Sequence, residues 1–433
     1  MLHALESYAF ERKPCMSQYV SASSSSRSSG TFKQVLSSPL YRGATIAMFL
    51  SGLGASAAAP QIVLFLVKEL GTPLPIAGLY YLTNLTAPIA GYLVGNHSDR
   101  TGERLILFRL CALAGFAGWA AIALSTKVWM PFLISSLVLA FSVAASSQLF
   151  AAVRDDLDQE AQGSSEGVVA IVRMALTAGW VIGPMVGAWL AAATSLRAML
   201  WMTALCALAQ IIPLGTLKRG QIRPPIATRP QWSVLPPSRW HTIRPLLAFT
   251  GLYVLVYAGE SVKYGFLPLY MDVQLHLEPA VRGAVIGIQP LVELAIMPFC
   301  VTLGRRVGFL WLMCIGAAFG VAANICFATT ASALGMFAGQ ILMGGVWGIF
   351  ASLGIIAAQR LLPTAVATAT AIFMSSTAVG SALGGLTGAL GVATVGLPEI
   401  FFIPAAFAFL AVLGLGAMAR SGALKSRPAG DSV

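Results

Sequence analysis

The sequence predicts an all-α membrane protein whose twelve transmembrane helices form two pseudo-symmetric six-helix bundles. The 433 residues are 57% hydrophobic and only 10% charged, with a mean hydropathy of +0.79. Soluble domains carry about 25% charged residues. Apolar stretches long enough to span a bilayer recur along the whole chain. In addition, the basic residues are distributed unevenly between the loops, as they are in membrane proteins.

Each predicted helix is a run of mostly apolar residues close to the roughly 20 that a spanning helix needs. The twelve runs cover residues 42–67, 75–97, 105–125, 129–150, 166–192, 196–216, 244–271, 280–302, 307–328, 331–358, 364–393 and 397–419. The chain also contains 43 glycines, which favours close contact between helices in lipid.

The Lys and Arg residues predict the orientation of the helices. With both termini placed in the cytoplasm, 21 of the 27 bases lie in cytoplasmic segments and four lie outside, while Arg173 and Lys263 fall inside helices. This bias follows the positive-inside rule. The net charge of +11 is therefore a topology signal, and we expect no nucleic-acid partner.

The predicted domains are two bundles joined by a long loop. Residues 1–41 contain the low-complexity run SASSSSRSSG and are expected to form a disordered cytoplasmic tail. The N-terminal bundle covers 42–216, a basic, proline-rich cytoplasmic loop covers 217–243, the C-terminal bundle covers 244–420, and a cytoplasmic tail follows at 421–433. RMALTAG at 173–179 and FMSSTAV at 373–379 occupy equivalent places in the halves. A parallel repeat of this kind can rock around a central site, which gives alternating access.

The loop between the second and third helices carries a specific motif. It reads GNHSDRTGER from Gly95 to Arg104. This resembles the major facilitator superfamily signature G-x-x-x-D-R-x-G-R-[KR], with Glu103 in place of a base. We expect Asp99, next to Arg100, to meet the positive N-terminus of the eleventh helix near Pro363. That contact would hold the cytoplasmic side closed in one state.

The fifth helix contains a second motif, GWVIGPMVG at 179–187. It resembles the antiporter motif G-x-x-x-G-P-x-x-G of major facilitator exporters, although Ala188 stands where the fuller motif has a further glycine. The glycines predict one close-packing face, and Pro184 predicts a kink. Packing by small residues in general is the alternative explanation.

Several stretches are similar to the bacterial sugar efflux transporter family. They include APQIVLFLVKELG from Ala59, GLYYLTN from Gly78, QLFAAVRDDL from Gln148, LVELAIMP from Leu291 and QILMGGVWGIFASLGIIAAQ from Gln340. The resemblance spans both halves and implies the major facilitator fold and export of sugars by proton exchange at the cell (inner) membrane. Export of drugs or other small organic molecules is the runner-up, and a membrane sensor that does not transport is a third possibility.

A sugar site needs amides, which offer hydrogen-bond donors and acceptors to hydroxyls, and aromatic faces that stack on the ring. Seven residues in helices expected to line the cavity meet this need: Gln61, Tyr80, Asn84, Gln148, Gln289, Gln340 and Trp347. For each residue taken alone, an interhelical hydrogen bond or a packing role is the more common explanation. As an uncharged set they favour a neutral polyol over a cationic drug.

Two sets of charges interrupt the apolar helices, where an isolated charge costs about 2.5–3.5 kcal/mol. Glu260 and Lys263 are three residues apart and can pair on one face, which we expect to point at the aqueous cavity or else to tune helix packing. Glu293 and Arg173, by contrast, match the sugar efflux pattern and lie at similar depths. They predict an ion pair between the bundles, either permanent or broken when a proton binds Glu293.

Enzyme activity and cofactors find no support in the sequence. The six cysteines show no metal-binding spacing, no His, Cys or carboxylate cluster has such spacing either, and no nucleophile motif is present. The expected partners are a small sugar or polyol, protons and the lipid bilayer, and the expected state is a monomer.

Overall fold

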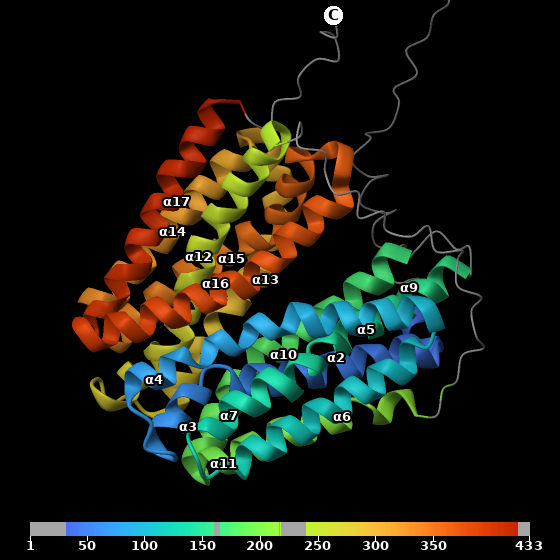
Figure 1. Ribbon diagram of the computed structural model, residues 1–433, viewed down its shortest axis with the longest axis horizontal. Helices are drawn as coiled ribbons and strands as arrows, with labels where there is room; N and C mark the ends of the chain where they lie inside the picture. The colour runs from blue at the N-terminus through green and yellow to red at the C-terminus, as the bar shows by residue number, and fades with distance from the viewer. Residues whose placement is uncertain (1–31, 160–164, 216, 218–239, 423–433) are drawn as a thin grey trace, which may run out of the picture.

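The computed structural model describes residues 32–159, 165–215, 217 and 240–422, and within these ranges the chain is helical without β-strands. Figure 1 shows two helical bundles, one blue to green and one yellow to red, which meet at one end and diverge toward the other. The predicted all-α architecture of two bundles is therefore confirmed.

The N-terminal bundle contains several interrupted helices. Its elements are α2 (Pro39–Ala58), α3 (Ile62–Lys68), α4 (Leu74–Gly78), η1 (Leu79–Thr86), α5 (Ala87–Thr101), α6 (Arg104–Ala123), α7 (Trp129–Ile134), η2 (Ser135–Leu139), α8 (Ala140–Ser142), α9 (Ala144–Gln159), α10 (Ser165–Ala193), α11 (Leu196–Ala209) and η3 (Ile212–Leu214).

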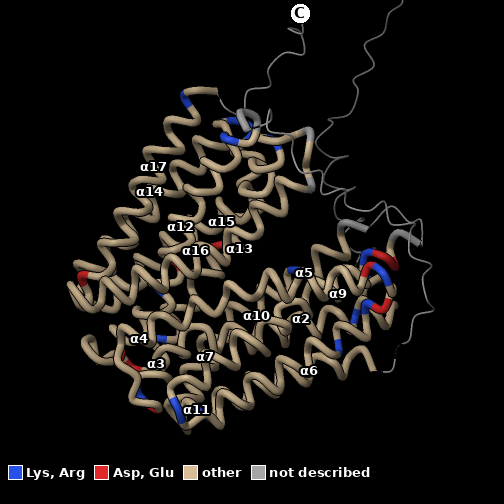
Figure 2. Tube along the Cα trace, viewed as in Figure 1, with Lys and Arg blue, Asp and Glu red and all other residues tan. Residues whose placement is uncertain are grey.

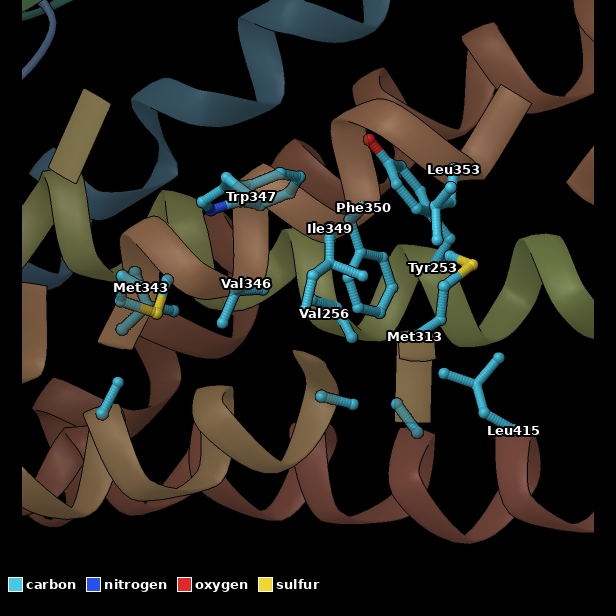
Figure 3. Close-up of a cluster of buried hydrophobic side chains, with 14 of the residues drawn as sticks. Tyr253, Val256, Met313, Met343, Val346, Trp347, Ile349, Phe350, Leu353 and Leu415 are labelled. Carbon is cyan, nitrogen blue, oxygen red and sulfur yellow. The ribbon is translucent and has the colours of Figure 1, made fainter. Parts of the chain in front are cut away.

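The C-terminal bundle has longer, mostly unbroken helices. Its elements are α12 (Trp240–Val273), α13 (Pro279–Val307), α14 (Phe309–Thr329), α15 (Ala333–Leu361), η5 (Pro363–Ala365), α16 (Val366–Thr394), η6 (Glu399–Phe401) and α17 (Phe402–Arg420). Its core is a continuous apolar cluster, part of which is drawn in Figure 3, where Tyr253, Phe350 and Trp347 lie among aliphatic side chains.

Eleven helices in the described ranges are long and apolar enough to cross a membrane. The expected span at 75–97 is the twelfth, and it is divided into α4, the 3₁₀ segment η1 and α5. Within η1 the hydroxyls of Thr83 and Thr86 donate to the carbonyls three residues earlier, at 2.7 and 2.8 Å. Such local bonds compete with regular helix geometry. The chain is thus a multi-pass membrane protein with one irregular span.

The expected domain boundaries differ slightly from the observed ones. Residues 32–37 are helical and α2 begins at Pro39, although the tail was expected to reach residue 41. Residues 1–31, most of the expected central loop and 423–433 lie outside the described ranges. α12 begins at Trp240, before the expected start at 244. Helices extend past the apolar windows because polar residues continue a helix beyond the lipid.

The two bundles touch at the end away from most of the basic residues. α10 packs on α13, η1 and α4 pack on α16, and α3 touches α12. Figure 2 shows basic residues gathered at the diverging ends; we call this the base-rich end. Its described bases include Arg104, Arg305, Arg306, Arg360 and Arg420. The molecule is therefore closed at one end and splayed at the base-rich end.

Candidate functional site

The most prominent polar feature is a buried cluster around Glu260 on α12. Its Oε1 accepts from Lys263 Nζ at 2.7 Å and from Gln289 Nε2 on α13 at 3.0 Å. Its Oε2 accepts from Trp347 Nε1 on α15 at 2.6 Å. The indole of Trp347 is visible in Figure 3. One carboxylate thus holds three helices of the C-terminal bundle together.

Lys263 is the least accessible charge in this cluster, with 0% of its side chain exposed. Its ammonium also donates to Gln289 Oε1 and lies 4.2 Å from the centre of the Tyr264 ring. The pairing of Glu260 with Lys263 predicted from their spacing is present. In this conformation α13 and α15 cover this face, and its exposure to an aqueous cavity in another state stays a prediction.

Two of the predicted sugar ligands, Gln289 and Trp347, therefore belong to the charged cluster. Their polar groups are hydrogen-bonded to Glu260 in this conformation. The sequence places them on separate helices, and the fold brings them to one carboxylate. Whether they bind a sugar in another state stays a prediction.

The remaining predicted ligands are spread over the molecule rather than gathered. Tyr80 pairs with Ser135 at 3.0 Å inside the N-terminal bundle, and Gln148 accepts from Ser98 near the base-rich end. Gln61 is buried where α2 gives way to α3. Each of these three lies within its own bundle, so packing explains it without a ligand.

Asn84 and Gln340 differ from that group. Asn84 Nδ2 donates to Ser381 on α16 at 2.7 Å and so bridges the two bundles. Gln340 is fully buried on α15, and neither polar atom of its side chain has a partner among the described residues. Buried amides are usually satisfied by protein or water, so this is a polar position inside the C-terminal bundle.

The predicted pair of Arg173 and Glu293 is not formed in this conformation. Arg173 is exposed on α10, Glu293 is half-buried on α13, and no ion pair within 4.0 Å joins them in the described chain. Glu293 is nevertheless close enough to Glu260, Lys263 and Arg173 to interact electrostatically with their charges. The helices that carry the two residues, α10 and α13, do pack together. An ion pair between Arg173 and Glu293 in another state stays a prediction.

The signature loop forms a network inside the N-terminal bundle. Arg104 reaches Asp99 at 2.6 Å and Asp155 at 3.1 Å, and it donates to Ser98 Oγ at 2.8 Å. Asp99 makes no described contact with the start of α16, and Arg100 is exposed. The expected Asp99 contact is absent here because the bundles diverge at this end. A contact in the opposite state is still to be tested.

Asp99→Asn is expected to slow transport several-fold while leaving the amount of folded protein unchanged. Folding should survive because Arg104 keeps Asp155 as its partner. Transport should suffer because a neutral side chain interacts less well with a helix N-terminus. The measurement is the initial transport rate per folded protein. The neighbouring Glu103→Gln is the control, and equal rates for both variants would remove Asp99 from gating.

The glycine motif of α10 allows close helix packing on two faces, one toward α2 and one toward α13. A Cβ on Gly179 would lie 2.5 Å from the backbone of α2, and Ser56 donates to the Gly179 carbonyl at 3.1 Å. On the other face the α10 backbone at Pro184 and Met185 touches α13 at Gly283, where a Cβ would come within 2.7 Å. The predicted close-packing face is therefore real, and the motif joins α10 to both bundles.

Two residues of interest were not predicted from the sequence. Tyr81, beside the predicted Tyr80, lies against Gly265 and Gly385 of the C-terminal bundle, and its hydroxyl is buried without a described partner. Asp272 joins bases from both bundles. The positive-inside count places four bases on the non-cytoplasmic side of the membrane, and two of them, Lys68 and Arg282, both contact Asp272. Asp272 could therefore have been singled out as a carboxylate on the same side.

Comparison with known proteins agrees with this architecture. The Major Facilitator Superfamily model matches residues 44–258. A Deinococcus radiodurans protein named for sugar efflux is 30% identical over 382 residues, which is 85% of this chain and 95% of the relative. Sugar efflux transporter C of Escherichia coli is 26% identical over 347 residues, 78% of this chain and 85% of the relative.

Solved structures show the same fold at lower identity. A crystal structure of a variant of the nucleoside transporter NupG superposes with a TM-score of 0.76 at 16% identity, covering 88% of this chain and 99% of the other. The peptide transporter POT in complex with sulfate gives 0.71 at 14%, covering 88% and 94%. Given the extent of these matches, the chain belongs to the sugar efflux transporter family of the major facilitator superfamily.

Proposed function

We propose that this protein exports sugars or sugar analogues from the cytoplasm in exchange for protons, by alternating access. The observation that carries the substrate class is the match over 95% of a relative named for sugar efflux. The positive-inside bias supports a cytoplasmic location for the base-rich end and both termini, in the cell (inner) membrane. The described conformation would then be open to the cytoplasm and closed to the outside.

Glu293 is the proposed proton carrier. It is half-buried on α13, has no ion-pair partner within 4.0 Å in the described chain, and faces a neighbourhood that contains Arg173 and Lys263. A carboxylate without a permanent partner can gain and lose a proton during the cycle. Glu260 is a poorer carrier, because both of its carboxylate oxygens already accept hydrogen bonds from Lys263, Gln289 and Trp347.

A second candidate is the export of cationic organic molecules. The lack of an ion-pair partner for Glu293 among the described residues favours it, because an unpaired carboxylate in a translocation pathway attracts cations. The two candidates differ in the charge of the substrate and can be separated directly.

Inverted membrane vesicles are expected to accumulate a labelled sugar when their lumen is acidified. Export by the cell becomes uptake in this orientation, and a protonophore should abolish it. A panel of labelled sugars and a cationic dye is measured in parallel, with vesicles lacking the protein as control. Uptake of the dye and of no sugar would establish the second candidate, whereas uptake insensitive to the protonophore would reject proton exchange.

A further inference from the structure

Asp272 lies at the closed end of the molecule and is shared by two bases. Its Oδ2 contacts Lys68 Nζ from α3, and its Oδ1 contacts Arg282 from α13. Lys68 belongs to the N-terminal bundle, while Asp272 and Arg282 belong to the C-terminal bundle. Within the described ranges, Lys68–Asp272 is the one ion pair that joins the bundles.

The placement of Asp272 is unfavourable without these partners. It lies in the last turn of α12, where exposed carbonyls repel an anion, and Arg282 lies in the first turn of α13, where exposed amides repel a cation. Each charge offsets the other. Lys68 lies at the C-terminal end of α3, where a cation is favourable. Arg282 thus fixes Asp272 within the C-terminal bundle. The second oxygen of the carboxylate remains accessible to Lys68 of the N-terminal bundle.

Exposure separates the two contacts further. The side chains of Asp272 and Arg282 are 15% and 14% exposed, whereas Lys68 is 47% exposed. The contact within the C-terminal bundle is therefore sheltered, and the contact between the bundles is open to water. Solvent-exposed ion pairs contribute little and break readily, as a contact that separates in every cycle must.

We propose that Lys68–Asp272 is a lock on the outer side of the transporter and that Arg282 positions Asp272 for it. The lock lies at the outer edge of the tight contact in which a Cβ on Gly78 would come 3.3 Å from the backbone of Ala389. It stabilises the conformation closed to the outside and must break before substrate leaves. The inference rests on the proposed orientation, but its test needs no sugar.

The test measures how often the outer side opens. A cysteine at Ala389, which is buried against the N-terminal bundle, is placed in a chain whose six native cysteines are replaced, and is labelled in intact cells with a membrane-impermeant maleimide. Asp272→Asn and Lys68→Gln are each expected to raise the labelling rate roughly fivefold, the size of a modest coupling between states.

Glu69→Gln is the matched control. Glu69 is next to Lys68 but pairs at 3.2 Å with Arg197 of its own bundle, so its loss should leave labelling unchanged. Lys68→Gln decides the matter if Asp272→Asn fails to fold. Unchanged labelling in well-expressed Lys68→Gln, or an equal rise with Glu69→Gln, would overturn the lock. Labelling results stand even if no sugar is transported, so this inference and the proposed function can fail separately.

Discussion

Glu260→Gln alone is expected to abolish accumulation of folded protein, and adding Lys263→Met is expected to restore it. Lys263 is fully buried, and among the described residues Glu260 is the one carboxylate within 4.0 Å of its ammonium. Removing one member of a buried pair costs about 3–5 kcal/mol, a large share of the roughly 5–15 kcal/mol that stabilises a typical domain. Replacing both members with neutral side chains is often tolerated.

The stability of each variant is followed by its yield and its melting temperature in detergent. Glu293→Gln provides the control, because it makes the same chemical change on the neighbouring helix α13 at a carboxylate without a described ion pair. It should melt close to the unmodified protein. If Glu260→Gln melts there too, Lys263 needs no counter-charge and the cluster is not structural in the way its geometry indicates.

Glu293→Gln is expected to lose all sugar accumulation driven by a pH gradient while keeping sugar exchange. Gln mimics the protonated acid, so binding and the movement of the bundles persist but no proton is carried. One pH unit corresponds to about 1.36 kcal/mol, or a tenfold ratio. For one proton exchanged per sugar, the accumulation ratio should therefore fall from about tenfold to unity.

Two measurements in vesicles separate these steps, namely accumulation under an imposed pH gradient and counterflow of labelled against unlabelled sugar. Arg173→Ala should disturb the same gradient-driven step, because Arg173 is the basic residue expected to meet Glu293. The double variant of Glu260 and Lys263 is the comparison for carrier identity. If it loses gradient-driven accumulation and Glu293→Gln keeps it, the α12 pair carries the proton and Glu293 does not.

The helices themselves could be predicted because lipid imposes a simple rule. A span must be apolar along its length, so the expected window 307–328 differs from α14, Phe309–Thr329, by only one or two residues at each end. The window at 75–97 predicted a span but not the 3₁₀ segment η1, since this depends on local bonds of Thr83 and Thr86. Apolarity alone does not distinguish two helical hydrogen-bond patterns.

The side-chain partners were harder to predict because the rotation of each helix is set by its neighbours. The i, i+3 spacing predicted the pairing of Glu260 with Lys263, but nothing in the sequence placed Trp347 on the same carboxylate. Tyr80 and not Tyr81 was predicted as a site residue, yet Tyr81 lies against Gly265 and Gly385 of the C-terminal bundle, since adjacent residues of a helix point to different sides. The expected contact of Asp99 with α16 requires the two bundles to meet at the base-rich end, and in the described conformation they diverge there (Figure 1).

The two faces of α10 have a consequence for motion. Toward α2, Gly179, Gly183 and Gly187 bring the two backbones into direct contact, which favours movement of the two helices as one body. Toward α13, the α10 backbone at Val181, Pro184 and Met185 lies close to Gly283 and Gly287, and Met185 also places its side chain against Gly287. Tilting one bundle against the other at this surface would unpack little and change few rotamers. The α10–α13 contact can thus act as the pivot of a rocking motion, in which the closed end opens while the splayed end closes.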